Sequence, residues 1–229
     1  MVDKRKKYIC VLDTETTNGI MVENKLDLSQ SIVYDIGYQI IDKKENVYVR
    51  RSFTIYEIFV GMKDLMQSAY YKEKIPAYWE DIKNNNRTLA TFFTIWKTFK
   101  EDMKMYNCNT VSAHNAYFDL NALNNTVRYL TKSKYRYFFD YDTVIWDTLK
   151  MSRQTYLKEK GYLNFCKEND YMTKHATPRP KATAEVLYRY ISGDYDFIEE
   201  HQGLADVEIE SQLLVALLRK HKKMTKTLF

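Results

Sequence analysis

Apolar runs bounded by polar turns predict the strands of this chain. One unbroken run covers the five residues 8–12 and ends abruptly at Asp13, so the stretch 7–13 is typical of a buried strand. Two more apolar-rich stretches flank the short polar turn 43–45, which is typical of a hairpin. We expect five strands, over residues 7–13, 31–42, 46–55 and 109–115 and from residue 143.

Elsewhere the apolar side chains recur at steps of three and four, which predicts amphipathic helices. The clearest example is rich in aromatic residues, which we expect to face the core. The stretch 143–151 begins as a strand and turns into a helix. Further helices are expected over residues 88–105, 116–130, 182–192 and 204–220. A three-strand meander followed by strands alternating with helices is typical of an α/β domain with a mixed sheet.

The composition supports one folded unit. With 229 residues, of which 45% are hydrophobic and 15% aromatic, the chain can bury a sizeable core. Its 6 glycines and 3 prolines leave little material for linkers. We therefore predict a single domain over residues 1–229, with a core over about 8–218 and a basic C-terminal tail over about 219–229.

The net charge and the cysteine spacing indicate which class of partner and which cellular compartment to expect. The formal net charge of +5 favours a polyanionic partner, although the basic runs 4–7 and 219–223 fit solvated ends equally well. The 3 cysteines are far apart, which argues against a zinc knuckle or a disulfide framework and predicts a reducing, cytoplasmic location. No apolar run reaches the length of a membrane span, so we expect no membrane partner.

The abrupt end of the first strand raises a question of electrostatics. Side chains two residues apart in a strand point to the same side, so Asp13 and Glu15 face the same way if the strand continues. Two carboxylates held together repel each other. Either the strand end is open to water, or a cation lies between the two acids.

Two further acids could join this pair. Asp119 lies near the start of a predicted helix, and Asp206 follows His201 by five residues. Four carboxylates suit Mg²⁺ or Mn²⁺, and could hold two such ions roughly 4 Å apart, the spacing that brackets a displacement at phosphorus. A histidine beside the attacking water could take its proton. The residues alone thus indicate a metal-assisted phosphodiesterase site.

Three short stretches carry a resemblance to a known family. VLDTETT (11–17), AHNAYFD (113–119) and HQGLAD (201–206) resemble, in order and spacing, the three motifs of the DEDDh, or DnaQ-like, exonucleases. That family includes the proofreading subunit of bacterial replicative polymerase, ribonuclease T and oligoribonuclease. IWDTLKMSR (145–153) and TAEVLYRYI (183–191) are also similar to the family pattern, and the resemblance covers residues from about 8 to 218.

The resemblance implies a fold and an activity. The fold would be ribonuclease H-like, an α/β domain with a central mixed five-stranded sheet flanked by helices. The activity would be that of a 3′–5′ exonuclease, which releases nucleoside monophosphates from the 3′ end of single-stranded or frayed DNA or RNA. The ligands of two Mg²⁺ or Mn²⁺ ions would be Asp13, Glu15, Asp119 and Asp206, with His201 as general base.

Four residues near the motifs are predicted to contact substrate: Thr14, Thr16, Asn115 and Phe118. Amides bind phosphate oxygens and aromatic rings stack on bases, although core packing explains Phe118 equally well. The irregular stretch 161–181 is interpreted as a surface connection, with substrate contact as the alternative.

The other histidines and one further acid are predicted to have no catalytic role. We expect a structural role for His114, an orienting or structural role for Asp147, and surface positions for His175 and His221. Two alternative functions stay open. One is a nucleic-acid-binding module without catalysis on the same fold, and the other is a structure-selective endonuclease.

Overall fold

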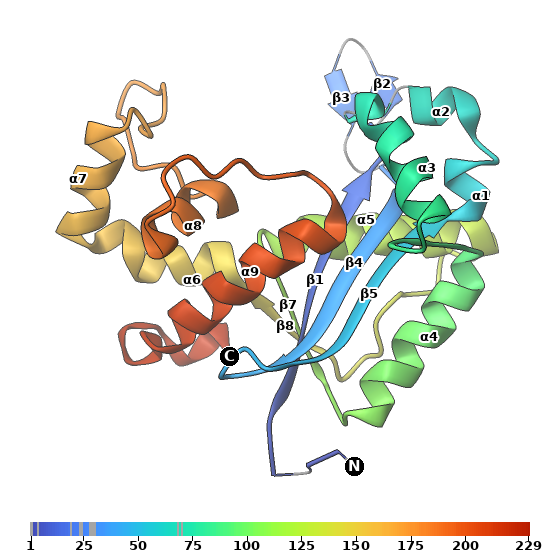
Figure 1. Cartoon of the computed structure of the whole chain (residues 1–229), viewed down its shortest axis with the longest axis horizontal. Helices are drawn as coiled ribbons and strands as arrows, with labels where there is room; N and C mark the ends of the chain where they lie inside the picture. Colours follow the sequence, from blue (N-terminus) through green and yellow to red (C-terminus); the bar gives the residue numbers. More distant parts are fainter. Residues whose placement is uncertain are drawn as a thin grey trace.

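A mixed sheet runs through the centre of the molecule (Figure 1), in the strand order β6-β5-β4-β1-β7-β8. The computed structural model describes residues 2–3, 5–18, 20–22, 25–27, 31–67, 69 and 71–229, so Lys4 of the basic run 4–7 lies outside the described residues. Strand β4 is antiparallel to β1 and β5, whereas the other neighbours are parallel. The six strands are β1 (Tyr8–Thr16), β4 (Val33–Asp42), β5 (Val47–Ile55), β6 (Thr88–Ala90), β7 (Thr110–Ala113) and β8 (Val144–Asp147).

The sheet has one strand more than the five we predicted. Strand β6 occupies the first residues of the stretch predicted as helix 88–105, and it pairs in parallel with β5. The helix starts later because Thr91 caps it, its hydroxyl accepting a hydrogen bond from the amide of Thr94 at 3.3 Å. The three residues before this cap are extended and complete the edge of the sheet.

Helices cover both faces of the sheet, and a separate two-stranded hairpin is formed by β2 (Ile20–Val22) and β3 (Lys25–Asp27). The prediction that 161–181 is irregular is wrong for its first part, which is helix α7. The helices are α1 (Tyr56–Phe59), α2 (Lys63–Gln67), α3 (Ile75–Lys83), α4 (Phe92–Met105), α5 (Ala116–Thr131), α6 (Thr148–Gln154), α7 (Lys160–Glu168), α8 (Ala184–Ser192) and α9 (Gly203–Leu218).

Two hydrophobic cores lie on opposite faces of the sheet, and β1 contributes to both. Cys10 and Leu12 face the core built with α1–α5, whereas Ile9 and Val11 face the core built with α6–α9. This alternation is the two-residue period of a strand buried on both sides. It fixes β1 in register and therefore fixes where the acids at its end lie.

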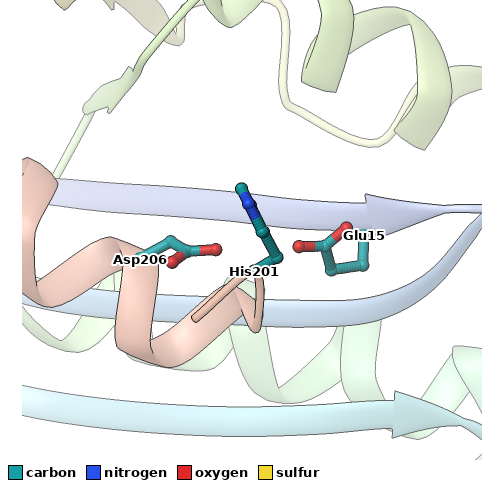
Figure 2. A group of neighbouring side chains, drawn as sticks. All are labelled: Glu15, His201 and Asp206. Atoms are coloured by element: carbon teal, nitrogen blue, oxygen red, sulfur yellow. The ribbon is translucent and has the colours of Figure 1, made fainter. Parts of the chain in front are cut away.

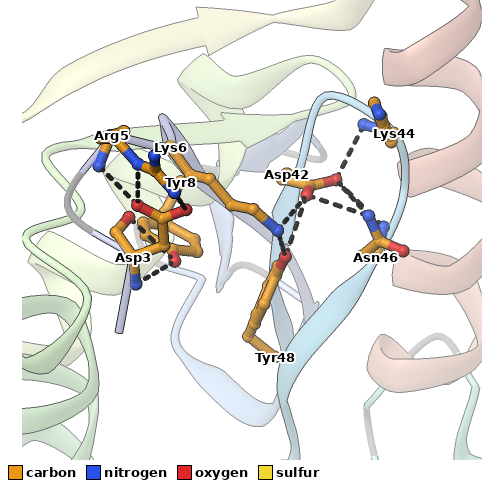
Figure 3. Close-up of polar contacts among 8 residues, drawn as sticks. All are labelled: Asp3, Arg5, Lys6, Tyr8, Asp42, Lys44, Asn46 and Tyr48. Carbon is orange, nitrogen blue, oxygen red and sulfur yellow. Dashed lines mark hydrogen bonds and ion pairs between the residues drawn. The ribbon is translucent and has the colours of Figure 1, made fainter. Parts of the chain in front are cut away.

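The hairpin between β4 and β5 is closed by a side chain. Asp42 accepts hydrogen bonds from the amides of Lys44 at 2.8 Å and Asn46 at 3.2 Å (Figure 3). Glu45 has a left-handed backbone, with a φ of 68°. The carboxylate thus replaces the Asn-Gly signal that the turn lacks.

The basic end of the chain packs against the body of the protein. Lys220 and Lys223 both pair with Glu159, at 2.8 Å, and the ring of Phe229 contacts Trp146. All three cysteines are buried and free. Within the described ranges, no helix is both long and apolar enough to cross a membrane.

Candidate active site

The four predicted acids are brought together from three elements at the end of β1. Asp13 and Glu15 lie on β1, Asp119 in the first turn of α5, and Asp206 in the first turn of α9. Glu15, Asp119 and Asp206 are buried, and Asp13 is half-buried. Strand β1 runs through Glu15, so the pair of acids does share one side, as the alternation of side chains predicted.

A close approach of two backbones places Asp206. At Gly37 of β4, an added Cβ would lie 2.1 Å from the carbonyl carbon of Gly203, where α9 begins. The amide of Gly203 also donates to the buried carboxylate of Asp35 at 3.0 Å. Because neither position has room for a side chain, the first turn of α9 lies directly on the sheet and Asp206 reaches the end of β1.

The loop before α9 is held by a buried ion pair. Arg87 pairs with Asp35, both almost fully buried, and its other nitrogen donates to the side-chain oxygen of Gln202 at 3.0 Å. The hydroxyl of Tyr78 donates to the same Asp35 carboxylate at 3.2 Å. This network holds Gln202, the residue that lies between His201 and the start of α9.

His201 lies beside two of the acids. Figure 2 shows its side chain between Glu15 and Asp206, and one ligand atom from each of the three residues lies within 4.8 Å of the others. Its ring stacks on Tyr71, with centroids 4.4 Å apart and planes 12° apart. Burial, and then the positive charge of Lys74, lower the pKa of His201, so near neutral pH the imidazole is held in its neutral, proton-accepting form.

The carboxyl groups at this site have raised pKa values. Burial is the largest cause at each, and it raises the pKa of Asp119 to about 7, that of Asp206 to about 8 and that of Glu15 to about 9. The pKa of Asp13 is also raised well above its ordinary value by burial and by repulsion from the neighbouring acids. Without a cation the site therefore resists full ionisation.

A fifth acid, Glu210, belongs to the cluster and was not predicted. It is buried on α9, four residues after Asp206, and it accepts a hydrogen bond from the amide of His114 at 3.2 Å. Burial and then repulsion from Asp119 raise its pKa well above the ordinary value. The sequence did carry a signal for Glu210, since it follows Asp206 by four residues and positions i and i+4 share one face of a helix.

The predicted substrate contacts have different surroundings. Thr14 is buried, and its hydroxyl donates to Asp119 at 2.8 Å, so it contacts a carboxylate of the cluster. Thr16 and Phe118 are half-buried. Asn115 is exposed and precedes α5 with a left-handed backbone, at a φ of 67°.

The acids Asp13 and Glu210 face a cleft of about 480 Å³. The same cleft is also lined by Arg153 of α6 and Lys181 of the stretch 161–181. The second part of that stretch is therefore close to the acids, although its first part is helix α7. The cleft is thus lined by both carboxyl groups and cations.

The remaining residues of interest lie as follows. The Nε2 of His114 donates to the carbonyl of Ala182 at 2.7 Å, so its Nδ1 accepts from the Thr148 hydroxyl at 2.9 Å. Asp147 caps α6 by accepting from the amide of Lys150 at 3.2 Å. Both arrangements are structural and agree with expectation, and His175 and His221 are exposed.

Solved structures share this fold. No family model matches the sequence, and no curated protein matches it significantly. The nuclease domain of 3′hExo, a DEDDh family member bound to rAMP, has a TM-score of 0.57 at 16% identity, covering 98% of each chain. E. coli exonuclease I in complex with a dT13 oligonucleotide carrying a 5cy label has a TM-score of 0.57 at 13% identity, covering 95% of this chain and 42% of that one. A zinc-bound form of the E. coli enzyme with single-stranded DNA has a TM-score of 0.52 at 13% identity, covering 95% and 41%.

These likenesses confirm the ribonuclease H-like α/β fold that the sequence predicted. The chain spans less than half the length of exonuclease I, and nearly all of the 3′hExo nuclease domain. The fold places the end of β1 beside the first turns of α5 and α9.

Proposed function

We propose that this chain is a metal-dependent 3′–5′ exonuclease that hydrolyses phosphodiester bonds at the 3′ end of single-stranded or frayed nucleic acid and releases nucleoside monophosphates. The observation that supports this most strongly is the convergence of five carboxyl groups with raised pKa values at the end of β1. Holding so many carboxyl groups together costs free energy when they ionise, and such perturbed groups are concentrated at functional sites. The likeness to exonucleases with bound nucleotides or oligonucleotides adds support from fold-level analogy.

The donor set fits two hard divalent cations. The acids offer only oxygen ligands, which Mg²⁺ and Mn²⁺ prefer. When bound, the two ions would polarise the attacking water and stabilise the charge that develops on the phosphate and leaving oxygen. We assign Asp13, Glu15, Asp119 and Asp206 as their ligands.

Other residues orient this set and handle the proton. Thr14 orients the Asp119 carboxyl group through its hydrogen bond. His201 is the general base, because it lies beside Glu15 and Asp206 and its lowered pKa keeps it neutral. The stacked ring of Tyr71 holds the imidazole in place.

The cleft supports binding of a single strand. Arg153 and Lys181 in its lining are suited to phosphate oxygens, and exposed Asn115 can donate its amide to the same groups. Thr16 and Phe118 remain predicted contacts for the terminal nucleotide. The carboxyl groups ionise fully only when cations are bound, and the cations would attract the scissile phosphate, so binding of the metals and of the scissile group is coupled.

The product pattern tests the proposal. We expect strands labelled at the 5′ end, of DNA or RNA, to shorten progressively from the 3′ end in Mg²⁺ and to release nucleoside monophosphates. A circular single strand should stay intact. Cutting of the circle would identify an endonuclease, and tight binding with no cutting of any strand would identify a binding module.

A further inference from the structure

A basic and aromatic surface lies at the far end of α5 from the acids. The helix ends at Thr131, and its last turn and the following loop carry four cations and three tyrosines within ten positions. We call this the α5-end surface; it consists of Arg128, Tyr129, Lys132, Lys134, Tyr135, Arg136 and Tyr137. None of these seven residues belongs to the acid cluster or lines its cleft.

The charge of the α5-end surface is not neutralised locally. No Asp or Glu occurs between residues 120 and 139, although the whole chain has a net charge of only +5. Within the part of the chain that the structure describes, none of the four cations forms an ion pair with a carboxylate. Four cations without acids on one surface attract a polyanion.

The tyrosines of this surface are presented to solvent. Tyr135 and Tyr137 are 79% and 58% exposed. The Arg128 guanidinium lies 4.9 Å from the Tyr137 ring centroid, and the Lys132 ammonium lies 4.3 Å from that of Tyr129. Exposed rings interleaved with cations are the elements that bind single-stranded nucleic acid, the rings by stacking on bases and the cations by contact with phosphates.

Helix α5 connects this surface to the acids. Tyr117, in the first turn beside Asp119, is 68% exposed, and Arg128 follows it by eleven residues. Eleven residues correspond to a rise of about 16 Å and return to within about 20° of the same helix face. Tyr117 and the α5-end surface therefore lie along one exposed side of the helix, and buried Asp119, two residues after Tyr117, faces away from that side.

We propose that the α5-end surface binds the part of the strand that lies upstream of the 3′ end held by the acids. This inference rests on the proposed function and adds a second contact to it. Thirteen residues of helix separate Asp119 from Lys132, about 20 Å, which a stacked strand rising roughly 3.4 Å per nucleotide spans in about six nucleotides. A trinucleotide cannot reach the surface, whereas a strand of about twenty nucleotides can.

The test compares binding of short and long strands. Affinities of labelled oligothymidylates of about three and about twenty nucleotides are measured by fluorescence anisotropy in Ca²⁺, which binds carboxylates but supports little turnover. For Lys132→Ala/Lys134→Ala, we expect weaker binding of the long strand only, with the slope of log K against log salt reduced by about 1.4, or 0.7 per lost phosphate contact. The matched control is Lys160→Ala/Lys167→Ala on α7, at the opposite end of the molecule (Figure 1).

Stacking is tested separately from charge. Tyr135→Ala should weaken binding of the long strand roughly tenfold, and exposed Tyr195→Ala, the control, should not. Equal affinity of the surface variants and the parent for the long strand would overturn the inference, as would equal losses for both lengths or equal losses in the controls. The inference would also be overturned if the surface variants bound the long strand like the parent but bound more weakly to vesicles containing phosphatidylserine, because the surface would then contact a membrane. Absence of cleavage would contradict the proposed function but leave these binding results interpretable.

Discussion

Replacing one buried carboxylate by its amide should stabilise the metal-free protein. We choose Asp119→Asn, because asparagine keeps the shape and the oxygen that accepts the Thr14 hydroxyl, but cannot carry the charge. Burial raises the pKa of Asp119 from its ordinary 3.8 to about 7 in the folded chain. The folded state therefore binds this proton more tightly than the unfolded state, and ionisation of Asp119 opposes folding as pH rises between these two values.

The shift sets the expected magnitude. At about pH 8 the full difference of about three pKa units applies, which corresponds to a gain of about 4 kcal/mol in the free energy of unfolding for Asp119→Asn. At about pH 5 only about 2 kcal/mol of that gain remains, because folded Asp119 is then protonated. The stabilisation of Asp119→Asn relative to the parent should thus grow by about 2 kcal/mol between these two pH values.

Denaturant unfolding in EDTA at both pH values measures this difference. The control is Asp142→Asn, an exposed acid outside the cluster, which should change little. Added Mg²⁺ should stabilise the parent, since it binds only the folded state, and should stabilise Asp119→Asn less. The electrostatic reasoning is refuted if Asp119→Asn gains nothing at the higher pH, or gains the same amount at both.

Three further predictions concern metal, base and packing. Mg²⁺ and Mn²⁺ should support cleavage and Ca²⁺ little, and full activity in EDTA would contradict a metal-assisted reaction. His201→Ala should slow single-turnover cleavage by about 10²–10⁴ and lose the part of the parent's pH profile that lies below the ordinary histidine pKa of 6.5; an unchanged profile would exclude His201 as the base. Gly37→Ala should lower the melting temperature and the activity together, because its Cβ would overlap Gly203, with a cost of about 1–3 kcal/mol; parent-like melting would show that the two backbones are not in contact.

Local patterns predicted the parts of the site that depend on local geometry. The alternation of strand side chains placed Asp13 and Glu15 on one side, and the predicted helix start at residue 116, inside the second motif, placed Asp119 in a first turn. The apolar periods predicted β1, β4, β5, β7 and β8 and the helices α4–α6, α8 and α9 to within a few residues, but they predicted none of α1–α3, β2 and β3. The edge strand β6 was missed because Leu89 fits the helical period of the aromatic residues that follow it.

Two misses had signals that were not used. In α7, Tyr162, Phe165 and Cys166 are buried at helical spacing, but the surrounding charges and the nearby prolines favoured an irregular segment. Glu210 was overlooked because its spacing from Asp206 has meaning only once α9 is known to lie with this face toward the acids.

Other features could not be predicted from local sequence. The pairing of Asp35 with Arg87 joins residues 52 positions apart, and the contact of Gly37 with Gly203 depends on how closely α9 packs on the sheet. Such long-range contacts depend on the assembled fold, because no period or motif in either stretch encodes its partner.

Cleavage by Asp13→Ala tests the central claim most directly. Parent and variant are compared in Mg²⁺ on a strand labelled at its 5′ end, after circular dichroism has shown that both are folded. The account predicts that the parent shortens the strand stepwise, whereas the variant leaves it uncut, because Asp13 is a proposed metal ligand with four neighbouring acids. A folded variant that cuts at the parent's rate would contradict the claim that these carboxylates form the catalytic metal site.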